Sequence, residues 1–120
     1  MIMVTLVLGA SPDPTRYAHL AVRRLIAAGH DVIAVGKRAG IIAAVEILPT
    51  IPPDREVDTV TLYLSPAHQA MWHAAILALR PRRVIFNPGA EDPVFAKQLE
   101  AANVEAMDAC TLVMLSTGAF

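Results

Sequence analysis

The first 29 residues of the sequence constrain the fold more than any other stretch. Residues 2–8 (IMVTLVL) are a continuous apolar run rich in β-branched side chains, which is typical of a strand buried on both faces. Gly9 follows directly, and apolar residues then recur at helical spacing as far as Gly29. We expect Asp13 to cap this helix, with Pro14 at its first position. A buried strand that turns through a glycine into an amphipathic helix favours a parallel α/β sheet.

The rest of the chain continues the alternation of strands and helices. It shows no internal repeat, low-complexity tract or linker. We therefore predict a single domain over residues 1–120, with the α/β architecture of a three-layer open parallel sheet of about five to six strands and helices on both faces. Further strands are expected at 31–35, 44–48, 58–64, 84–86 and 104–107, and further helices at 67–79, 92–102 and 111–115.

The composition indicates a globular domain with much apolar surface to cover. Hydrophobic residues make up 55% of the chain and charged residues only 18%, and the mean hydropathy is +0.48. A domain of this size leaves a large share of its surface in water. The expected helix at 67–79 is apolar almost all round, so we expect it to be buried on more than one side, with a homodimer as one way to cover it.

Charge and sequence pattern argue against nucleic acid and membranes as partners. The net charge is −1, which gives no overall field toward phosphates or lipid headgroups. Arg80, Arg82 and Arg83 are expected to be solvent-exposed at the amino edge of the sheet, and no aromatic residues alternate with them. No run reaches the ~18 apolar residues of a membrane helix. The first residues lack a basic segment, so we interpret them as a strand rather than a signal peptide and expect a cytoplasmic protein.

Four polar loops should meet at one edge of the predicted sheet. In open α/β sheets, ligands bind outside the carboxyl ends of the strands, where the strand order reverses. The loops that leave those ends are rich in Gly, Pro, Ser or Asn, and His68 lies close to the same edge. These loops are residues 9–16, 36–40, 64–66 and 87–90.

The first of these loops has the features of a phosphate site. Gly9 allows a tight turn, and the backbone N–H groups at the start of the following helix favour an anion. Ser11 offers a hydroxyl group, and Arg16 offers a fork-shaped cation. The second and third glycines of the dinucleotide fingerprint are absent, and Asp13 would compete for the same N–H groups. A plain capped β-α turn is the alternative.

The second loop favours a nucleotide whose ribose carries a phosphate. NAD sites usually place Asp or Glu at the end of the second strand, but Gly36, Lys37 and Arg38 stand there in this chain. Cations at this position suit NADP, which has a 2′-phosphate, or coenzyme A, which has a 3′-phosphate. The alternative is a solvated loop with two ordinary surface cations.

Several of these segments resemble a known family. They are residues 9–16 (GASPDPTR), 29–35 (GHDVIAV), 58–60 (DTV), 88–90 (PGA) and 107–111 (MDACT). Together they resemble the small stand-alone CoA-binding proteins, which are Rossmann-type domains similar to the CoA-binding part of the succinyl-CoA synthetase alpha subunit. The resemblance spans nearly the whole chain. The synthetases use a phosphorylated histidine of a second domain, which these 120 residues do not hold, so we do not carry that activity over.

The resemblance implies where the parts of a CoA molecule would lie. The diphosphate would rest on residues 9–16, with Ser11 and Arg16 as contacts, and the adenosine end would lie near residues 35–38. The pantetheine arm would run over residues 64–66 toward residues 87–89. The expected binding residues are Gly9, Ala10, Ser11, Arg16, Gly36, Lys37, Arg38, Leu64, Ser65, Pro66, Asn87, Pro88 and Gly89.

No catalytic or metal site is expected. The four histidines lack the spacing and the accompanying carboxylate of a zinc site. His19 is expected at the surface or partly satisfied. Cys110 is interpreted as a buried inert thiol, the alternative being a thiol that forms a mixed disulfide with the pantetheine sulfur. The expected function is non-catalytic binding of CoA or an acyl-CoA. The alternatives are an NADP-binding oxidoreductase or redox sensor and, third, an interaction protein with a vestigial nucleotide site.

Overall fold

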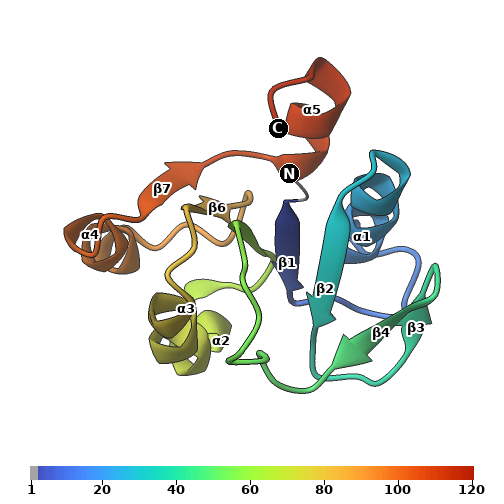
Figure 1. Ribbon diagram of the computed structural model, residues 1–120, viewed down its shortest axis with the longest axis horizontal. Helices are drawn as coiled ribbons and strands as arrows, with labels where there is room; N and C mark the ends of the chain where they lie inside the picture. Colours follow the sequence, from blue (N-terminus) through green and yellow to red (C-terminus); the bar gives the residue numbers. More distant parts are fainter. Residues whose placement is uncertain (1–2) are drawn as a thin grey trace.

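The computed structural model describes residues 3–120 and shows a seven-stranded sheet in the order β3-β4-β2-β1-β5-β6-β7 (Figure 1). All neighbouring strands are parallel except β3 and β4, which pair antiparallel. The strands are β1 (Val4–Leu8), β2 (Asp31–Val35), β3 (Ile41–Ile42), β4 (Val45–Leu48), β5 (Thr59–Leu62), β6 (Arg83–Phe86) and β7 (Glu105–Asp108). The helices are α1 (Tyr17–Ala27), α2 (Pro66–Gln69), η1 (Ala70–Trp72, a 3₁₀ turn), α3 (His73–Leu79), α4 (Pro93–Ala101) and α5 (Thr111–Thr117).

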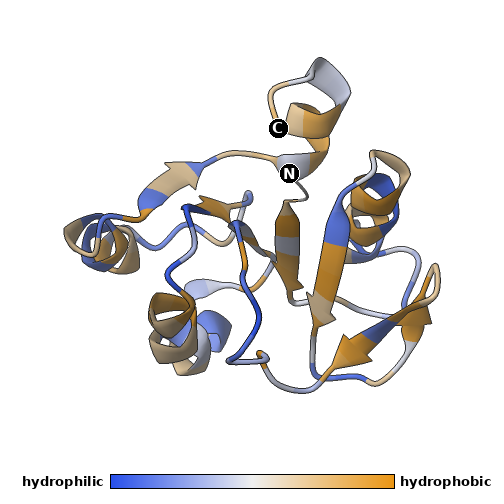
Figure 2. Cartoon of the chain, in the orientation of Figure 1, coloured by the Kyte–Doolittle hydropathy of each residue, from blue (hydrophilic) through white to orange (hydrophobic). Residues whose placement is uncertain are grey.

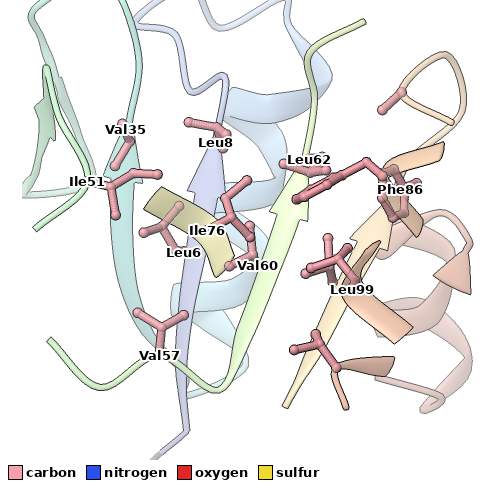
Figure 3. Close-up of a cluster of buried hydrophobic side chains, with 14 of the residues drawn as sticks. Leu6, Leu8, Val35, Ile51, Val57, Val60, Leu62, Ile76, Phe86 and Leu99 are labelled. Carbon is pink, nitrogen blue, oxygen red and sulfur yellow. The ribbon is translucent and has the colours of Figure 1, made fainter. Parts of the chain in front are cut away.

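Helices cover both faces of the sheet, which confirms the predicted α/β architecture. On one face, Ile76 of α3 and Leu99 of α4 pack against alternate residues of β1, β5 and β6 such as Leu6 (Figure 3). On the other face, Val22 and Leu25 of α1 pack against the intervening residues of β1 and β2. Figure 2 shows the apolar character concentrated along β1, β2 and β4. Both faces of the central strands are therefore buried, as a parallel sheet requires.

Three details of the predicted elements are wrong. The sheet has seven strands rather than five or six, because the two-residue strand β3 turns back on β4 through Ala43 and Ala44, both at positive φ. The helix expected at 67–79 is divided into α2, η1 and α3. It is not buried on several sides, since Met71 remains 76% exposed. Ile2, which was expected in the first strand, lies outside the described residues.

The basic segment before β6 also differs from expectation. Arg82 is exposed, and its guanidinium donates to the Asp58 carboxylate at 2.9 and 3.1 Å. Arg83, expected in solvent, is only 4% exposed. Its Nε donates to Thr59 Oγ1 and its Nη2 to the Phe120 carbonyl oxygen, both at 2.8 Å. Its guanidinium also lies 4.4 Å from the centroid of the Phe120 ring. Arg83 therefore anchors the C-terminal residue to the sheet.

No helix in the part of the chain that the structure describes combines the length and the apolar character needed to cross a membrane.

Candidate functional site

A cleft of about 600 Å³ lies at the carboxyl ends of the central strands. All four loops that were predicted to form a site contribute to it. Of the expected residues, Gly9, Ala10, Ser11, Arg16, Lys37, Arg38, Leu64, Ser65, Pro88 and Gly89 line the cleft. Tyr17, Ala18, Tyr63, His68 and Ala90 complete the lining.

The start of α1 faces this cleft without a protein cap. The N-cap residue is Arg16, it makes no side-chain capping hydrogen bond to any of residues 3–120, and the first turn holds no acid. The prediction that Asp13 caps the helix is wrong. The Asp13 carboxylate instead accepts from the backbone N–H of Thr15 at 3.0 Å and from its hydroxyl at 2.7 Å. Tyr17 and Ala18 lie in the first turn and line the cleft, so the positive end of α1 is directed at the cleft, an arrangement that favours an anion.

The charges around the cleft suit an anionic ligand. Arg16, Lys37 and Arg38 are all exposed and line it, whereas the lining, within residues 3–120, includes no Asp or Glu. Asp13 lies just outside, with its carboxylate 3.9 Å from Arg16 Nε. The hydrogen bonds from Thr15 hold the pKa of Asp13 below its ordinary value, so this carboxylate stays charged at neutral pH and partly screens the cations.

Gly36 does not line the cleft but packs against Ala10, which does. Its N–H donates to Leu48 O at 3.0 Å, and Val35 O accepts from the N–H groups of Gly9 and Ala10. A Cβ atom on Gly36 would lie 2.1 Å from the Ala10 carbonyl oxygen. The absence of a side chain on Gly36 therefore lets the loop that carries Lys37 and Arg38 pack directly against the backbone of the loop at residues 9–16.

His19 is buried, with 4% exposure, and its side chain hydrogen-bonds to the backbone of the loop at residues 9–16. Its Nε2 accepts from Arg23 Nε at 2.9 Å, so its Nδ1 carries the proton and donates to Ser11 O, also at 2.9 Å. The helical spacing of His19 did not reveal this role, because the contact joins residues eight positions apart across a loop.

Asn87 and Pro66 are also outside the lining. Asn87 is buried, and its Nδ2 donates to Thr61 Oγ1 at 2.6 Å and to Leu62 O at 2.9 Å. Its Oδ1 accepts from the N–H of Thr111 at 2.8 Å. Asn87 thus joins β5, the end of β6 and the start of α5, and its amide is already engaged within the protein.

Two polar side chains are exposed on the side of the cleft formed by β5 and α2, and Tyr63 lines it beside them. Ser65 Oγ and His68 Nδ1 are 2.9 Å apart, and both residues are exposed in the cleft. Burial raises the pKa of Tyr63 to about 12, which keeps this phenol neutral. Its hydroxyl is buried and has no hydrogen-bond partner among residues 3–120.

Gln69 is a part of this site that the sequence reasoning missed. It is fully buried at the end of α2, and its Nε2 donates to Leu64 O at 2.8 Å and Ala90 O at 2.9 Å. A signal for it exists, since residues 66–79 carry no charged side chain and Gln69 is one of their few polar residues. Within residues 3–120 no group of His, Cys, Asp and Glu side chains is arranged to hold a metal ion.

Comparison with known protein families identifies the family of this chain. The family model described as "CoA binding domain" matches residues 4–116. No curated protein matches the chain.

Several solved structures share the fold. One, described only as an uncharacterized protein, is 44% identical with a TM-score of 0.96, and the match covers 100% of this chain and 99% of that one. A protein from Thermus thermophilus (cell-free ID.343) is 25% identical with a TM-score of 0.85, over 99% and 91% of the two chains. A hypothetical protein from Pyrococcus horikoshii OT3 is 20% identical with a TM-score of 0.84, over 94% and 81%.

The family match spans the whole sheet, from β1 to β7, and the four loops of the cleft, and the chain therefore belongs to the CoA binding domain family.

Proposed function

We propose that this chain binds coenzyme A or an acyl-CoA in the cleft and does so without catalysing a reaction on it. The observation that carries the proposal is the start of α1, uncapped by any side chain of residues 3–120, beside Arg16, Lys37 and Arg38, in a lining to which the described residues contribute no Asp or Glu. Membership of the CoA binding domain family supports a ligand of this class.

The parts of the ligand follow the chemistry of the lining. The diphosphate rests on the loop from Gly9 to Arg16, because backbone N–H groups and a guanidinium both favour phosphate oxygens. The 3′-phosphate lies at Lys37 and Arg38. The pantetheine arm then runs along residues 64–66 toward Pro88 and Gly89, where the lining that the structure describes includes no Asp, Glu, Lys or Arg.

NADP is the alternative ligand, and the same cation pair supports it. Lys37 and Arg38 suit a 2′-phosphate as well as a 3′-phosphate, and an NADP-bound chain would act as an oxidoreductase or redox sensor. The loop after β1 argues against this alternative, because it holds Gly9 without the second and third glycines that let a backbone approach a dinucleotide.

A second copy of the chain is the proposed protein partner. The segment from α2 to α3 carries no charged side chain, and Met71 on it is 76% exposed. A two-fold contact through this segment would cover the apolar surface without opposing like charges. A monomeric mass in dilute solution would exclude it.

Thermal unfolding with three ligands tests the choice between CoA and NADP. A ligand at 100 times its dissociation constant adds about 2.7 kcal/mol to the free energy of unfolding, which raises the melting temperature by several degrees. We expect the largest rise with CoA, a smaller one with NADP and the smallest with NAD. A larger rise with NADP than with CoA would overturn the proposed function.

A further inference from the structure

The buried side chain of Gln69 joins two loops that line the cleft. Leu64 lies two residues after the end of β5, and Ala90 belongs to the loop after β6. The two hydrogens of Gln69 Nε2 are directed at the carbonyl oxygens of these residues, at 2.8 and 2.9 Å. Within residues 3–120, neither carbonyl oxygen has another hydrogen-bond donor.

A second contact fixes the orientation of the Gln69 amide. His73 Nε2 lies 3.1 Å from Gln69 Oε1, and the imidazole is stacked on Phe95 with ring centroids 3.6 Å apart and planes at 8°. The carboxylate of Asp92, the N-cap of α4, lies 3.9 Å from the same His73 nitrogen. Because the two loop carbonyls can only accept, the amide nitrogen must face them, which leaves Oε1 to accept from His73 Nε2–H.

Simple packing does not explain a glutamine here. The neighbouring residues of α2 and α3 are uncharged and largely apolar, and a buried amide is unfavourable unless its hydrogen bonds are made. An apolar side chain of similar length would fill the space but leave both carbonyl oxygens unpaired. The amide is therefore suited to holding two separate loops at a fixed spacing.

We propose that Gln69 is a positioning residue that sets the spacing of the Leu64 and Ala90 loops and thereby the affinity for the pantetheine arm. This inference rests on the proposed function, because it assumes that the arm runs between these loops. The adenosine and phosphate groups would bind on the α1 side of the cleft, among Arg16, Lys37 and Arg38. A substitution of Gln69 should therefore lower the affinity for the pantetheine arm and leave the affinity for the head group unchanged.

The test compares CoA with adenosine 3′,5′-bisphosphate, a head-group fragment without the arm, by isothermal titration calorimetry. We expect Gln69→Met to weaken CoA binding by about tenfold or more, since preorganisation of the loops is lost, and to leave affinity for the fragment unchanged. Gln98→Met, at an exposed glutamine of α4, is the matched control and should alter neither affinity.

Two results would overturn the inference while leaving the proposed function intact. They are an unchanged CoA affinity in Gln69→Met and an equal loss for CoA and the fragment, which would indicate a general effect on the fold. A wild-type chain that binds neither ligand would instead refute the proposed function together with the inference that rests on it.

The wild-type chain provides a second test that does not depend on whether the variant folds. The sequence contains two glutamines, Gln69 and Gln98, so selective ¹⁵N labelling of glutamine side chains resolves the site from an internal control. We expect CoA to shift the Gln69 amide signals, adenosine 3′,5′-bisphosphate to leave them in place, and neither ligand to move those of Gln98. Gln69 signals that stay fixed under saturating CoA would overturn the inference.

Discussion

Replacing Gly36 by alanine tests how closely the first two loops of the cleft depend on each other. The added Cβ would lie 2.1 Å from the Ala10 carbonyl oxygen, so one backbone segment must retreat by about 1 Å before the contact reaches ordinary separations. Neither segment is free to do so, because Val35 O accepts from the N–H groups of Gly9 and Ala10, and Gly36 itself donates to Leu48 O.

The expected cost follows from this overlap. Overpacking usually costs about 1–3 kcal/mol, and a clash between two hydrogen-bonded backbones belongs at the upper end. For a chain of this size, about 3 kcal/mol lowers the melting temperature by about 10–15 °C. Displacement of the Ala10 peptide should also weaken CoA binding.

Differential scanning fluorimetry and calorimetric titration measure both effects. Gly118→Ala is the comparison variant, because Gly118 has φ of +76° with nothing within 4 Å of an added Cβ. It should cost only about 1 kcal/mol of backbone strain and leave CoA binding unchanged. A Gly36→Ala protein as stable as Gly118→Ala, with unchanged CoA affinity, would refute the reasoning.

Three further variants probe charge. Arg16→Ala should weaken CoA binding by about 1.5–3 kcal/mol through loss of a charge-assisted phosphate bond; an unchanged affinity in calorimetry would remove Arg16 from the site. Asp13→Asn keeps an acceptor for the Thr15 N–H but removes the negative charge beside Arg16, so it should strengthen CoA binding, and less so at high salt; weaker binding would contradict this. The hydrogen bonds from Arg82 hold the pKa of Asp58 below its ordinary value of 3.8. The contribution of Asp58 to the free energy of unfolding should therefore be present above that value and be lost as the pH falls through the lower, folded-state pKa. Urea unfolding at a series of pH values should show a free energy of unfolding that falls less steeply with decreasing pH in Asp58→Asn than in wild type.

The sequence predicted the central part of the fold because its signals there are local. The apolar run before Gly9 and the run at 31–35 identify strands buried on both faces, and β1 and β2 are found there. The pair Ile41–Ile42 was missed because two residues are too few to show a strand period. The break between α2 and α3 was also missed, because residues 67–79 contain no glycine or proline that would mark it.

The candidate site was predictable by position but not in its supporting contacts. Carboxyl-terminal loops of neighbouring parallel strands must meet at one edge, so the lining from Gly9 to Gly89 follows largely from topology. Asp13 had two local acceptor roles open to it, a helix cap and a turn within its own loop, and short-range spacing does not choose between them. Asn87 and Arg83 are buried against partners far away in the sequence, and His19 against a loop residue eight positions before it. Periodicity does not reveal such contacts.

The central claim is that the cleft recognises CoA through its phosphorylated adenosine head, and the most direct measurement is a calorimetric comparison of CoA with dephospho-CoA. These ligands differ only in the 3′-phosphate that Lys37 and Arg38 are proposed to bind. We predict that CoA binds at least about tenfold more tightly, as expected for a charge-assisted contact worth roughly 1.5 kcal/mol or more, and that Lys37→Ala combined with Arg38→Ala abolishes the difference. Equal affinities for the two ligands, or no binding of CoA, would contradict the account.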